Sequence, residues 1–329
     1  MTKKRIAVTG ATGFLGSHLC KRFIADGYHV RILVRDINKA REYEGQVEKI
    51  IVGDIADKEA LNELMQGVEC AVHLVSNFRI ASGPPESYHQ INVEGTKTAL
   101  HAARAAGVKR FVHCSTIGVH GNVKETPATE DSPYNPGDLY QETKTEAEQF
   151  CLNKTKKEGM EIVVIRPTSL YGPGDMRMLK MFKMLAKRTF FTVGPCTENF
   201  HAVYIDDAVN GFIKVMDTPG ISGQVFFIGG PEYVPLKEYI NTAAKAVGVP
   251  PPWLHFPYWF FYGAAVVCES ICVPLRIEPP LHRRRVRFFK NNRAFSIDKA
   301  RKTLKYNPLI NLEEGMKRTV AWYKKNGFL

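Results

Sequence analysis

A glycine-rich stretch near the N-terminus constrains the fold more than any other part of the chain. Residues 9–16 read TGATGFLG, directly after the apolar run at 6–8. Apolar residues then recur at helical spacing, so the pattern predicts a strand, a tight turn and a helix. Gly10 and Gly13 permit a sharp turn close to a pyrophosphate, and Gly16 permits close packing of helix on strand. With free N–H groups at the helix start, the stretch predicts a dinucleotide site rather than a plain turn.

Composition excludes several other classes of protein. Of 329 residues, 44% are hydrophobic and 24% charged, which is typical of a soluble globular chain. The seven cysteines are scattered without a CxxC pair or zinc-ligand spacing, so we expect reduced thiols, no metal and a cytoplasmic location. The N-terminus leads directly into the first strand, so no signal peptide is expected.

The formal net charge of +12 is compatible with nucleic acid, an acidic membrane surface or anionic small molecules as partners. No nucleic-acid-binding motif accompanies it, and nucleic acid is not expected as a partner. The excess of basic residues is concentrated late in the chain, between 283 and 293.

The first half of the chain alternates short apolar runs with longer amphipathic ones. Such alternation predicts an α/β fold, a Rossmann-type doubly wound parallel sheet, because its strands are apolar on both faces. The expected strands are 6–8, 30–34, 48–52, 70–74, 110–114 and 162–165, and the expected helices 14–25, 58–65, 86–106 and 139–158.

A smaller, mainly helical lobe is expected to follow this domain. We expect the dinucleotide-binding domain to comprise 1–175 together with 201–230, which contains a returning strand at 225–228. The lobe, formed by 176–200 and 231–329, is expected to bind the substrate in a cleft against the sheet.

The end of the second strand bears on the choice of cofactor. NAD enzymes carry an acidic residue there, which accepts a hydrogen bond from the ribose 2′-hydroxyl. Here Val34 ends the strand, and Arg35, whose guanidinium suits a 2′-phosphate, follows it. Asp36 has the sequence spacing of the ribose acid but lies past the strand, where it also suits a helix N-cap. NADP is therefore expected in preference to NAD.

Two further strand ends carry residues for binding and chemistry. Asp54 and Ile55 follow the third strand, where they are placed to meet the adenine. Ser115 and Thr116 follow the fifth strand, at the carboxyl edge where such sheets bind ligands.

Tyr140 and Lys144 are four residues apart in a predicted helix, so they share one face. We expect the ammonium to lower the pKa of the phenol. The phenol could then exchange a proton with a carbonyl or hydroxyl oxygen while the cofactor exchanges hydride. The hydroxyl of Thr116 or Ser115 could hold the same oxygen.

These motifs together resemble the extended short-chain dehydrogenase/reductase family, in particular its NAD-dependent epimerase/dehydratase and 3β-hydroxysteroid dehydrogenase-like members. The resemblance runs the length of the chain. It rests on TGATGFLG at 9–16, GDI at 53–55, HLVS at 73–76, NVEGT at 92–96, STIGVHG at 115–121, YQETK at 140–144, RPTSLYGPGD at 166–175 and HAVYIDDAV at 201–209.

The resemblance implies roles for particular residues. Thr116 matches the family's catalytic hydroxyl residue, Tyr140 its acid/base and Lys144 the partner that also binds the nicotinamide ribose. Val75, Asn92 and Pro167 match positions that line the nicotinamide side, although Asn92 could equally be a buried structural amide. The expected cofactor-binding residues are Gly10, Thr12, Gly13, Phe14, Leu15, Gly16, Arg35, Asp54, Ile55, Val75, Asn92, Tyr140, Lys144 and Pro167.

Two departures from the family pattern concern the substrate. His120 replaces an aromatic residue, and we expect a packed histidine rather than a substrate contact. Sugar-nucleotide enzymes often carry an Arg-Asp pair where this chain has Phe200-His201. The pattern is therefore more similar to the steroid and dihydroflavonol-reductase branches.

The stretch 253–275 is unusually apolar and aromatic, although prolines and Glu269 interrupt it. Its uninterrupted part, 257–268, is too short to span a bilayer. We expect a buried helix of the lobe in preference to a helix lying in a membrane interface. The basic segment 282–293 beside it would suit an anionic lipid surface.

The sequence thus predicts an NAD(P)-dependent oxidoreductase that interconverts a secondary alcohol and a ketone on a hydrophobic steroid-, lipid- or flavonoid-like substrate. The alternative enzyme is a sugar-nucleotide epimerase or dehydratase with bound NAD(P). A non-catalytic cofactor-binding regulatory protein is less favoured. Peripheral membrane contact is considered, and the resemblance implies a homodimer through the helices at 86–106 and 139–158.

Overall fold

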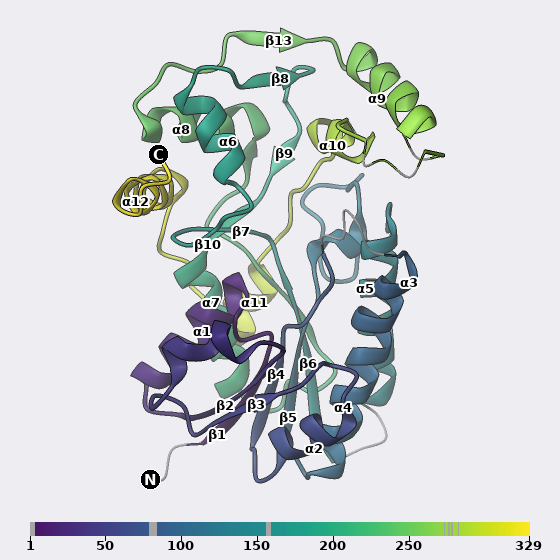
Figure 1. Ribbon diagram of the computed structural model, residues 1–329, viewed down its shortest axis with the longest axis vertical. Coiled ribbons are helices and arrows are strands. Elements are labelled where there is room, and N and C mark those ends of the chain that lie inside the picture. The colour runs from purple at the N-terminus through teal and green to yellow at the C-terminus, as the bar shows by residue number, and fades with distance from the viewer. Residues whose placement is uncertain are drawn as a thin grey trace.

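A sheet of seven parallel strands forms the centre of the molecule (Figure 1). The computed structural model describes residues 4–78, 84–155, 159–272, 274–275, 277, 279–281 and 283–329. The strand order is β11-β6-β5-β4-β1-β2-β3, and the predicted doubly wound sheet is confirmed. The strands are β1 (Arg5–Thr9), β2 (His29–Val34), β3 (Lys49–Val52), β4 (Cys70–His73), β5 (Arg110–Cys114), β6 (Glu161–Pro167) and β11 (Val225–Ile228).

Helices cover both faces of the sheet (Figure 1). Helices α1 (Phe14–Ala25) and α7 (Ile205–Asp217) pack on one face. Helices α2 (Lys58–Met65), α4 (Gly95–Ala105) and α5 (Leu139–Lys154) pack on the other. Strand β1 shows the alternation that this layering requires, because Ile6 and Val8 enter the first core and Ala7 the second.

The predicted helices differ little from the observed ones. Helices α1 and α2 have the predicted bounds. The predicted helix 86–106 consists of α3 (Glu86–His89), the π-helical turn η2 (Gln90–Glu94) and α4. Helix α5 ends at Lys154, and residues 156–158 of the predicted helix lie outside the described part of the chain.

The chain leaves the sheet after β6 and later comes back to it. Strand β7 (Ser169–Tyr171) pairs with β10 (Ala202–Tyr204), which leads into α7. Strand β11 then pairs in parallel with β6, so the predicted return at 225–228 is confirmed.

The remaining elements lie beyond the carboxyl ends of the strands (Figure 1). Helix α8 (Leu236–Val247) packs against α6 (Leu179–Ala186) and α12 (Leu312–Lys325). Four short strands extend this group: β8 (Phe191–Val193) pairs with β13 (Leu254–Phe256), and β9 (Asn199–Phe200) pairs with β12 (Val234–Pro235). Helix α11 (Asp298–Leu304) returns to the sheet beside β11.

Helix α9 (Tyr258–Cys272) contradicts one prediction. It lies at the outer edge of the molecule beside α10 (Arg283–Arg287) (Figure 1). Of its 15 residues, all of them described, only Ala265 is buried. The predicted buried lobe helix is therefore wrong, because no element in the described part of the chain covers the outward side of α9. Within the described ranges, no helix combines the length and hydropathy needed to cross a bilayer.

Candidate active site

The glycine stretch forms a loop that lies against the end of β4. Gly10 has a φ of 78°, and a Cβ on it would lie 3.1 Å from the carbonyl carbon of Leu74 and the amide nitrogen of Val75. A Cβ on Gly16 would lie 2.1 Å from the carbonyl oxygen of Gly10. Larger residues at either position would force the loop away from the strand or from α1.

The start of α1 is open. Its N-cap is Gly13, which supplies no side-chain hydrogen bond to the first helical N–H groups. Thr12 and Gly13 are exposed, Phe14 is partly buried under the guanidinium of Arg177, and Leu15 is buried. A loop without a Cβ at Gly10 and Gly13, followed by a helix start without a side-chain cap, has the donors and the space that a pyrophosphate requires. The residues present therefore fit a dinucleotide cofactor.

The tip of β2 carries an exposed guanidinium. Val34 is buried, and Arg35 is exposed, with no hydrogen-bond or ion-pair partner for its side chain among the described residues. Asp36 accepts a hydrogen bond from the amide of Asn38 at 3.0 Å and caps the turn η1 (Ile37–Tyr43). The N-cap interpretation of Asp36 is confirmed, and Arg35 is left as the charged group at this tip.

The segment after β3 differs from its expected role in one respect. Asp54 is exposed, and its side chain accepts a hydrogen bond from the amide of Ala56 at 3.2 Å. Ile55 is buried in the core behind the sheet, where it fills the space left by Gly95 of α4. The side chain of Ile55 therefore supports α4 instead of lying open to an adenine.

Asn92 makes the contacts of a structural amide. Its side-chain oxygen accepts from the amide of Asn77 at 2.6 Å, and its nitrogen donates to the carbonyl of Asn77 at 3.2 Å. The same nitrogen donates to the hydroxyl of Thr143 at 3.0 Å. Asn92 lies in the π-helical turn η2 and ties the segment after β4 to α5, one turn from the catalytic candidates.

Tyr140, Lys144 and Thr116 gather where β5 ends. The Nζ of Lys144 is buried and donates to the carbonyl of Cys114 at 2.7 Å. Thr116 caps the short turn η3 (Ile117–His120), and its hydroxyl accepts from the amide of Gly118 at 3.0 Å. Tyr140 lies in the first turn of α5, which Asp138 caps, and its phenol is close to the hydroxyl of Thr116.

The pKa of Tyr140 is shifted in the direction opposite to the predicted one. Burial raises the pKa of Tyr140 to about 12, and the hydroxyls of Ser76 and Thr116 oppose this rise only in part. The ammonium of Lys144 donates to the carbonyl of Cys114, and burial dominates the pKa of Tyr140. Burial also lowers the pKa of Lys144. The expectation that Lys144 lowers the pKa of Tyr140 is therefore wrong for the cofactor-free protein.

A buried hydrogen bond distinguishes Ser115 from Thr116. The hydroxyl of Ser115 donates to the carboxylate of Glu148, which is fully buried one turn beyond Lys144. Glu148 also forms an ion pair with Arg166 of β6, whose side chain is 2% exposed. Because Glu148 binds the Ser115 hydroxyl, Thr116 is the residue of the pair left to face a substrate.

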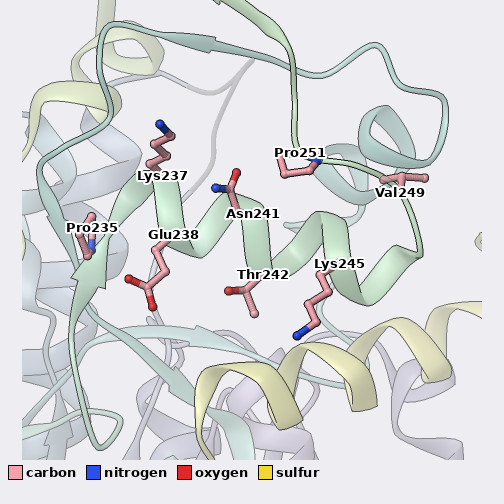
Figure 2. Close-up of a pocket in the computed structure, with 8 residues that line it drawn as sticks. All are labelled: Pro235, Lys237, Glu238, Asn241, Thr242, Lys245, Val249 and Pro251. Carbon is pink, nitrogen blue, oxygen red and sulfur yellow. The ribbon is translucent and has the colours of Figure 1, made fainter.

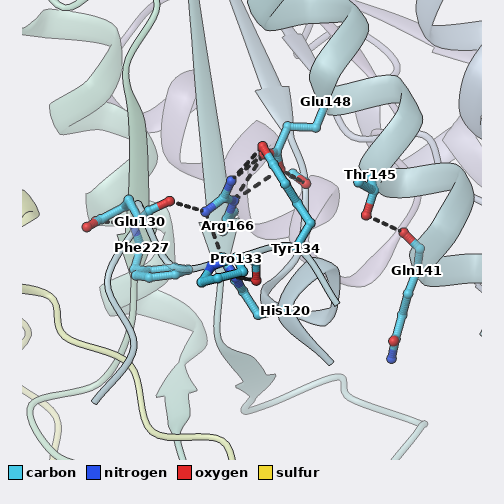
Figure 3. A network of polar contacts seen from close by, with 10 residues as sticks. His120, Glu130, Pro133, Tyr134, Gln141, Thr145, Glu148, Arg166 and Phe227 are labelled. Carbon is cyan, nitrogen blue, oxygen red and sulfur yellow. Dashed lines mark hydrogen bonds and ion pairs between the residues drawn. The ribbon is translucent and has the colours of Figure 1, made fainter. Parts of the chain in front are cut away.

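His120 belongs to the same network (Figure 3). Its Nδ1 donates to the carbonyl of Pro133 at 3.0 Å, so its Nε2 accepts from Arg166 at 2.8 Å. Burial and the nearby guanidinium lower the pKa of His120, which keeps the ring neutral. Tyr134 completes the group by donating to Glu148 at 2.7 Å. The prediction of a packed histidine is confirmed.

The segment after β4 brings residues that the sequence analysis did not single out. Ser76 lies beside the phenol of Tyr140. Phe78 packs edge-on against the Tyr140 ring, with 4.9 Å between centroids, and is 40% exposed. Val75 is partly exposed next to Gly10, whereas Pro167 is buried at the end of β6. Ser76 falls within the HLVS motif, which was the available signal.

A surface hollow of about 560 Å³ lies elsewhere, on the outer side of α8 (Figure 2). Lys237, Asn241, Thr242 and Lys245 line it from the helix, and Pro251 closes one end. None of its lining residues belongs to the glycine loop or to the group around Tyr140. The hollow therefore lies outside the candidate active site.

The doubly wound sheet, the glycine loop and the group of Thr116, Tyr140 and Lys144 at the end of β5 are the features of a dinucleotide-dependent enzyme. The model of the NAD dependent epimerase/dehydratase family matches residues 6–229. The chain belongs to that family, and it is an NAD(P)-dependent oxidoreductase of the extended short-chain type.

Relatives similar over nearly their whole length carry more specific names. The chain is 31% identical to a 3-beta-hydroxysteroid dehydrogenase of Mycolicibacterium neoaurum, over 97% of this chain and 91% of the relative. It is 30% identical to a 2-alkyl-3-oxoalkanoate reductase of Stenotrophomonas maltophilia, over 96% of this chain and 98% of the relative. It is 29% identical to the Schizosaccharomyces pombe sterol-4-alpha-carboxylate 3-dehydrogenase, decarboxylating, over 98% of both chains.

Solved structures agree with the fold. The crystal structure of gox2253 superimposes with a TM-score of 0.84 and 26% identity, over 99% of this chain and 100% of that one. The UDP-glucuronic acid 4-epimerase of Bacillus cereus, solved in complex with NAD, gives a TM-score of 0.79 at 24% identity. The match covers 98% of this chain and 99% of that one. At that identity the second likeness supports the fold alone.

Proposed function

We propose that this enzyme interconverts a secondary alcohol and a ketone on a hydrophobic, steroid- or lipid-like substrate. The observation that carries the proposal is the group formed by Tyr140, Thr116 and Lys144 where β5 ends, on the same sheet edge as the glycine loop. The named activities of the full-length relatives support the same reaction, since each acts on a hydroxyl or keto carbon of an apolar compound.

In the proposed mechanism, Tyr140 exchanges the proton. In reduction, the phenol gives its proton to the carbonyl oxygen of the substrate; in oxidation, the phenolate takes it back. Thr116 hydrogen-bonds to the same oxygen and holds it beside the phenol. The cofactor, when bound, supplies or accepts the hydride. Lys144 lies under the site as a buried cation and would bind the ribose next to the nicotinamide.

Glu148 and Arg166 have a positioning role in this proposal. Glu148 fixes the side chain of Ser115, the chain neighbour of Thr116, and shares helix α5 with Tyr140 and Lys144. A fixed distance between hydroxyl and phenol matters because proton transfer requires close approach of the donor and acceptor.

A sugar-nucleotide epimerase or dehydratase is the second candidate, favoured by the likeness of fold. The residues at the position of the Arg-Asp pair argue against it. Phe200 packs on Tyr239 with 4.5 Å between ring centroids. His201 is buried and contacts the carbonyl of Gly230 through Nε2 at 3.0 Å. Neither side chain offers a charge to a nucleotide.

NADP is the proposed cofactor in preference to NAD. The support is a buried Val34 followed by an exposed Arg35, whose side chain has no partner among the described residues, at the tip of β2. The glycine loop, with Gly10, Thr12, Gly13, Phe14, Leu15 and Gly16, would hold the pyrophosphate. Asp54 would meet the adenosine.

The assembly and surroundings of the enzyme are also proposals. We propose a homodimer through the helices at 86–105 and 139–154, and a substrate-binding lobe formed by 176–200 and 231–329. A cytoplasmic enzyme in peripheral contact with a membrane would receive an apolar substrate without its passage through water.

A turnover panel tests the function. Purified enzyme is given 3-hydroxysteroids, 3-ketosteroids, 3-keto lipids and UDP-sugars, each with free NAD(H) and NADP(H). Consumption of added cofactor with a steroid or lipid supports the proposal. Conversion of a UDP-sugar without net consumption of cofactor would overturn it in favour of the epimerase.

A further inference from the structure

Helix α9 turns an apolar side towards solvent. Trp259 is 74% exposed, Val267 60% and Ile271 57%, and Phe260 lies on the same side. The exposed positions 259, 260, 263, 264, 266, 267, 270 and 271 carry one polar residue, Ser270. A helix on the surface of a globular protein ordinarily shows the reverse arrangement, with polar residues outward.

The other side of α9 holds the helix in place. Ala265 packs against Val193 and Val286 in a small core of its own. Phe261 contacts Phe191 at 5.1 Å and Phe256 at 5.2 Å between ring centroids. These contacts fix the rotation of α9, so its outward side stays outward.

The chain on either side of α9 exposes further apolar side chains and cations. Trp253 is 68% exposed before the helix, and Leu275 is 63% exposed after it. Helix α10 and the residues after it add cations: Arg283, Arg287 and Lys290 are all exposed. The chain from 283 to 293 carries six basic residues and no acidic one.

These features point to one occupant. We propose that the outward side of α9 (Trp259, Phe260, Val267 and Ile271) lies in the surface of an anionic phospholipid bilayer, with α10 against the headgroups. Exposed tryptophans, an apolar helix side and adjacent cations are the features of helices that lie in a membrane interface. At about 1.5 Å per residue, α9 is also too short to cross the hydrocarbon core.

A second copy of the chain fits this surface less well. A symmetric pairing through α9 would bring the cations of α10 close to those of the other copy, and like charges repel. Anionic headgroups supply the opposite charge. This inference rests on the proposed function for its purpose, delivery of an apolar substrate, but not for the binding itself.

Vesicle sedimentation tests the proposal, with protein free of cofactor and substrate. At low salt, we expect binding at least about tenfold stronger to phosphatidylcholine vesicles with about 30 mol% phosphatidylserine than to phosphatidylcholine alone. Trp259→Ser combined with Phe260→Ser should abolish binding, and Arg287→Ser combined with Lys290→Ser should weaken it about tenfold. Leu309→Ser, at an apolar residue 73% exposed elsewhere, and Lys324→Ser combined with Lys325→Ser are the matched controls.

Depth of insertion gives a second measurement. In Trp322→Phe protein, the two tryptophans left are Trp253 and Trp259, and brominated lipids should quench their emission. Wild-type protein that stays in the supernatant with acidic vesicles would overturn the proposal. Wild-type protein that self-associates instead of binding vesicles, and that loses this self-association in the Trp259/Phe260 variant, would also overturn the proposal. A second copy of the chain would then cover α9. Vesicle binding without steroid or lipid turnover would contradict the proposed reaction and leave this inference standing.

Discussion

The candidate active site and α9 distribute polar and apolar side chains in opposite ways. Around Tyr140, charged groups are buried: Lys144, Glu148 and Arg166 all lie inside the protein. On α9, apolar groups are exposed, and Trp259 is the clearest case. Each arrangement is costly in a cofactor-free protein in water, because buried charge loses hydration and exposed apolar surface orders water. We infer that both regions were shaped by what they bind.

The largest expected effect comes from removing the central hydroxyl. Tyr140→Phe keeps the ring and its contact with Phe78 but removes the proton donor. Turnover should fall by about 10²- to 10⁴-fold while cofactor binding survives. Steady-state kinetics and cofactor titration measure the two quantities. Turnover close to that of the wild type would exclude Tyr140 from the mechanism.

The next largest effect is expected on stability, when the buried ion pair between Glu148 and Arg166 is broken. Arg166→Leu leaves Glu148 buried without its charge partner, so the free energy of unfolding should fall by about 3–5 kcal/mol. Urea denaturation measures it. The control is Arg318→Ser, since Arg318 and Glu314 form an exposed pair on α12, and a far smaller change is expected there. Equal losses in both variants would remove the distinction between interior and surface charge.

The pH dependence follows from the raised pKa of Tyr140. Oxidation needs the phenolate, so kcat/KM for the alcohol should rise about tenfold per pH unit across the alkaline range towards pH 12. Reduction needs the phenol, which is present below that pKa, so kcat/KM for the ketone should stay level from neutral to mildly alkaline pH. A plateau for oxidation near neutral pH would show that the pKa of Tyr140 in the working enzyme lies far lower.

The choice of cofactor depends on one exposed charge. Arg35→Ala should weaken NADPH binding about 10- to 100-fold and leave NADH binding nearly unchanged, because only NADPH carries the 2′-phosphate. Fluorescence titration of both cofactors gives the ratio. A wild-type preference for NADH would contradict the assignment.

The smallest effect is expected where apolar residues are most exposed. Trp259→Ser combined with Phe260→Ser should change the free energy of unfolding by no more than about 0.5 kcal/mol, because the folded protein leaves both side chains largely in water. Thermal or urea unfolding without vesicles is the measurement. A large loss of stability would mean that these residues pack within the protein, and the comparison with the candidate active site would fail.

The sequence predicted the sheet well because the inner strands are buried on both faces. Runs such as Val163 to Ile165 cannot face water, and the glycine stretch sets the first turn. The same reasoning failed for α9. Hydropathy reports that a helix avoids water but not what covers it, and here no other element of the described chain covers the outward side.

The site was predictable as a set of residues but less so as a geometry. Spacing placed Tyr140 and Lys144 on one helix face, yet it could not show that the Lys144 ammonium binds the carbonyl of Cys114. It also could not separate Ser115 from Thr116, because the partner of Ser115 is Glu148, far along the chain. Contacts between distant segments decide protonation and side-chain direction, and local patterns do not contain them.

The pairing of β11 with β6 also governs how the protein can be synthesised and divided. During translation β6 emerges well before β11, so it remains an unpaired edge of the sheet until the chain has passed Ile228. A fragment cut at 175 would keep that edge open permanently and would be prone to join other chains through it. A fragment that ends after β11 would close it.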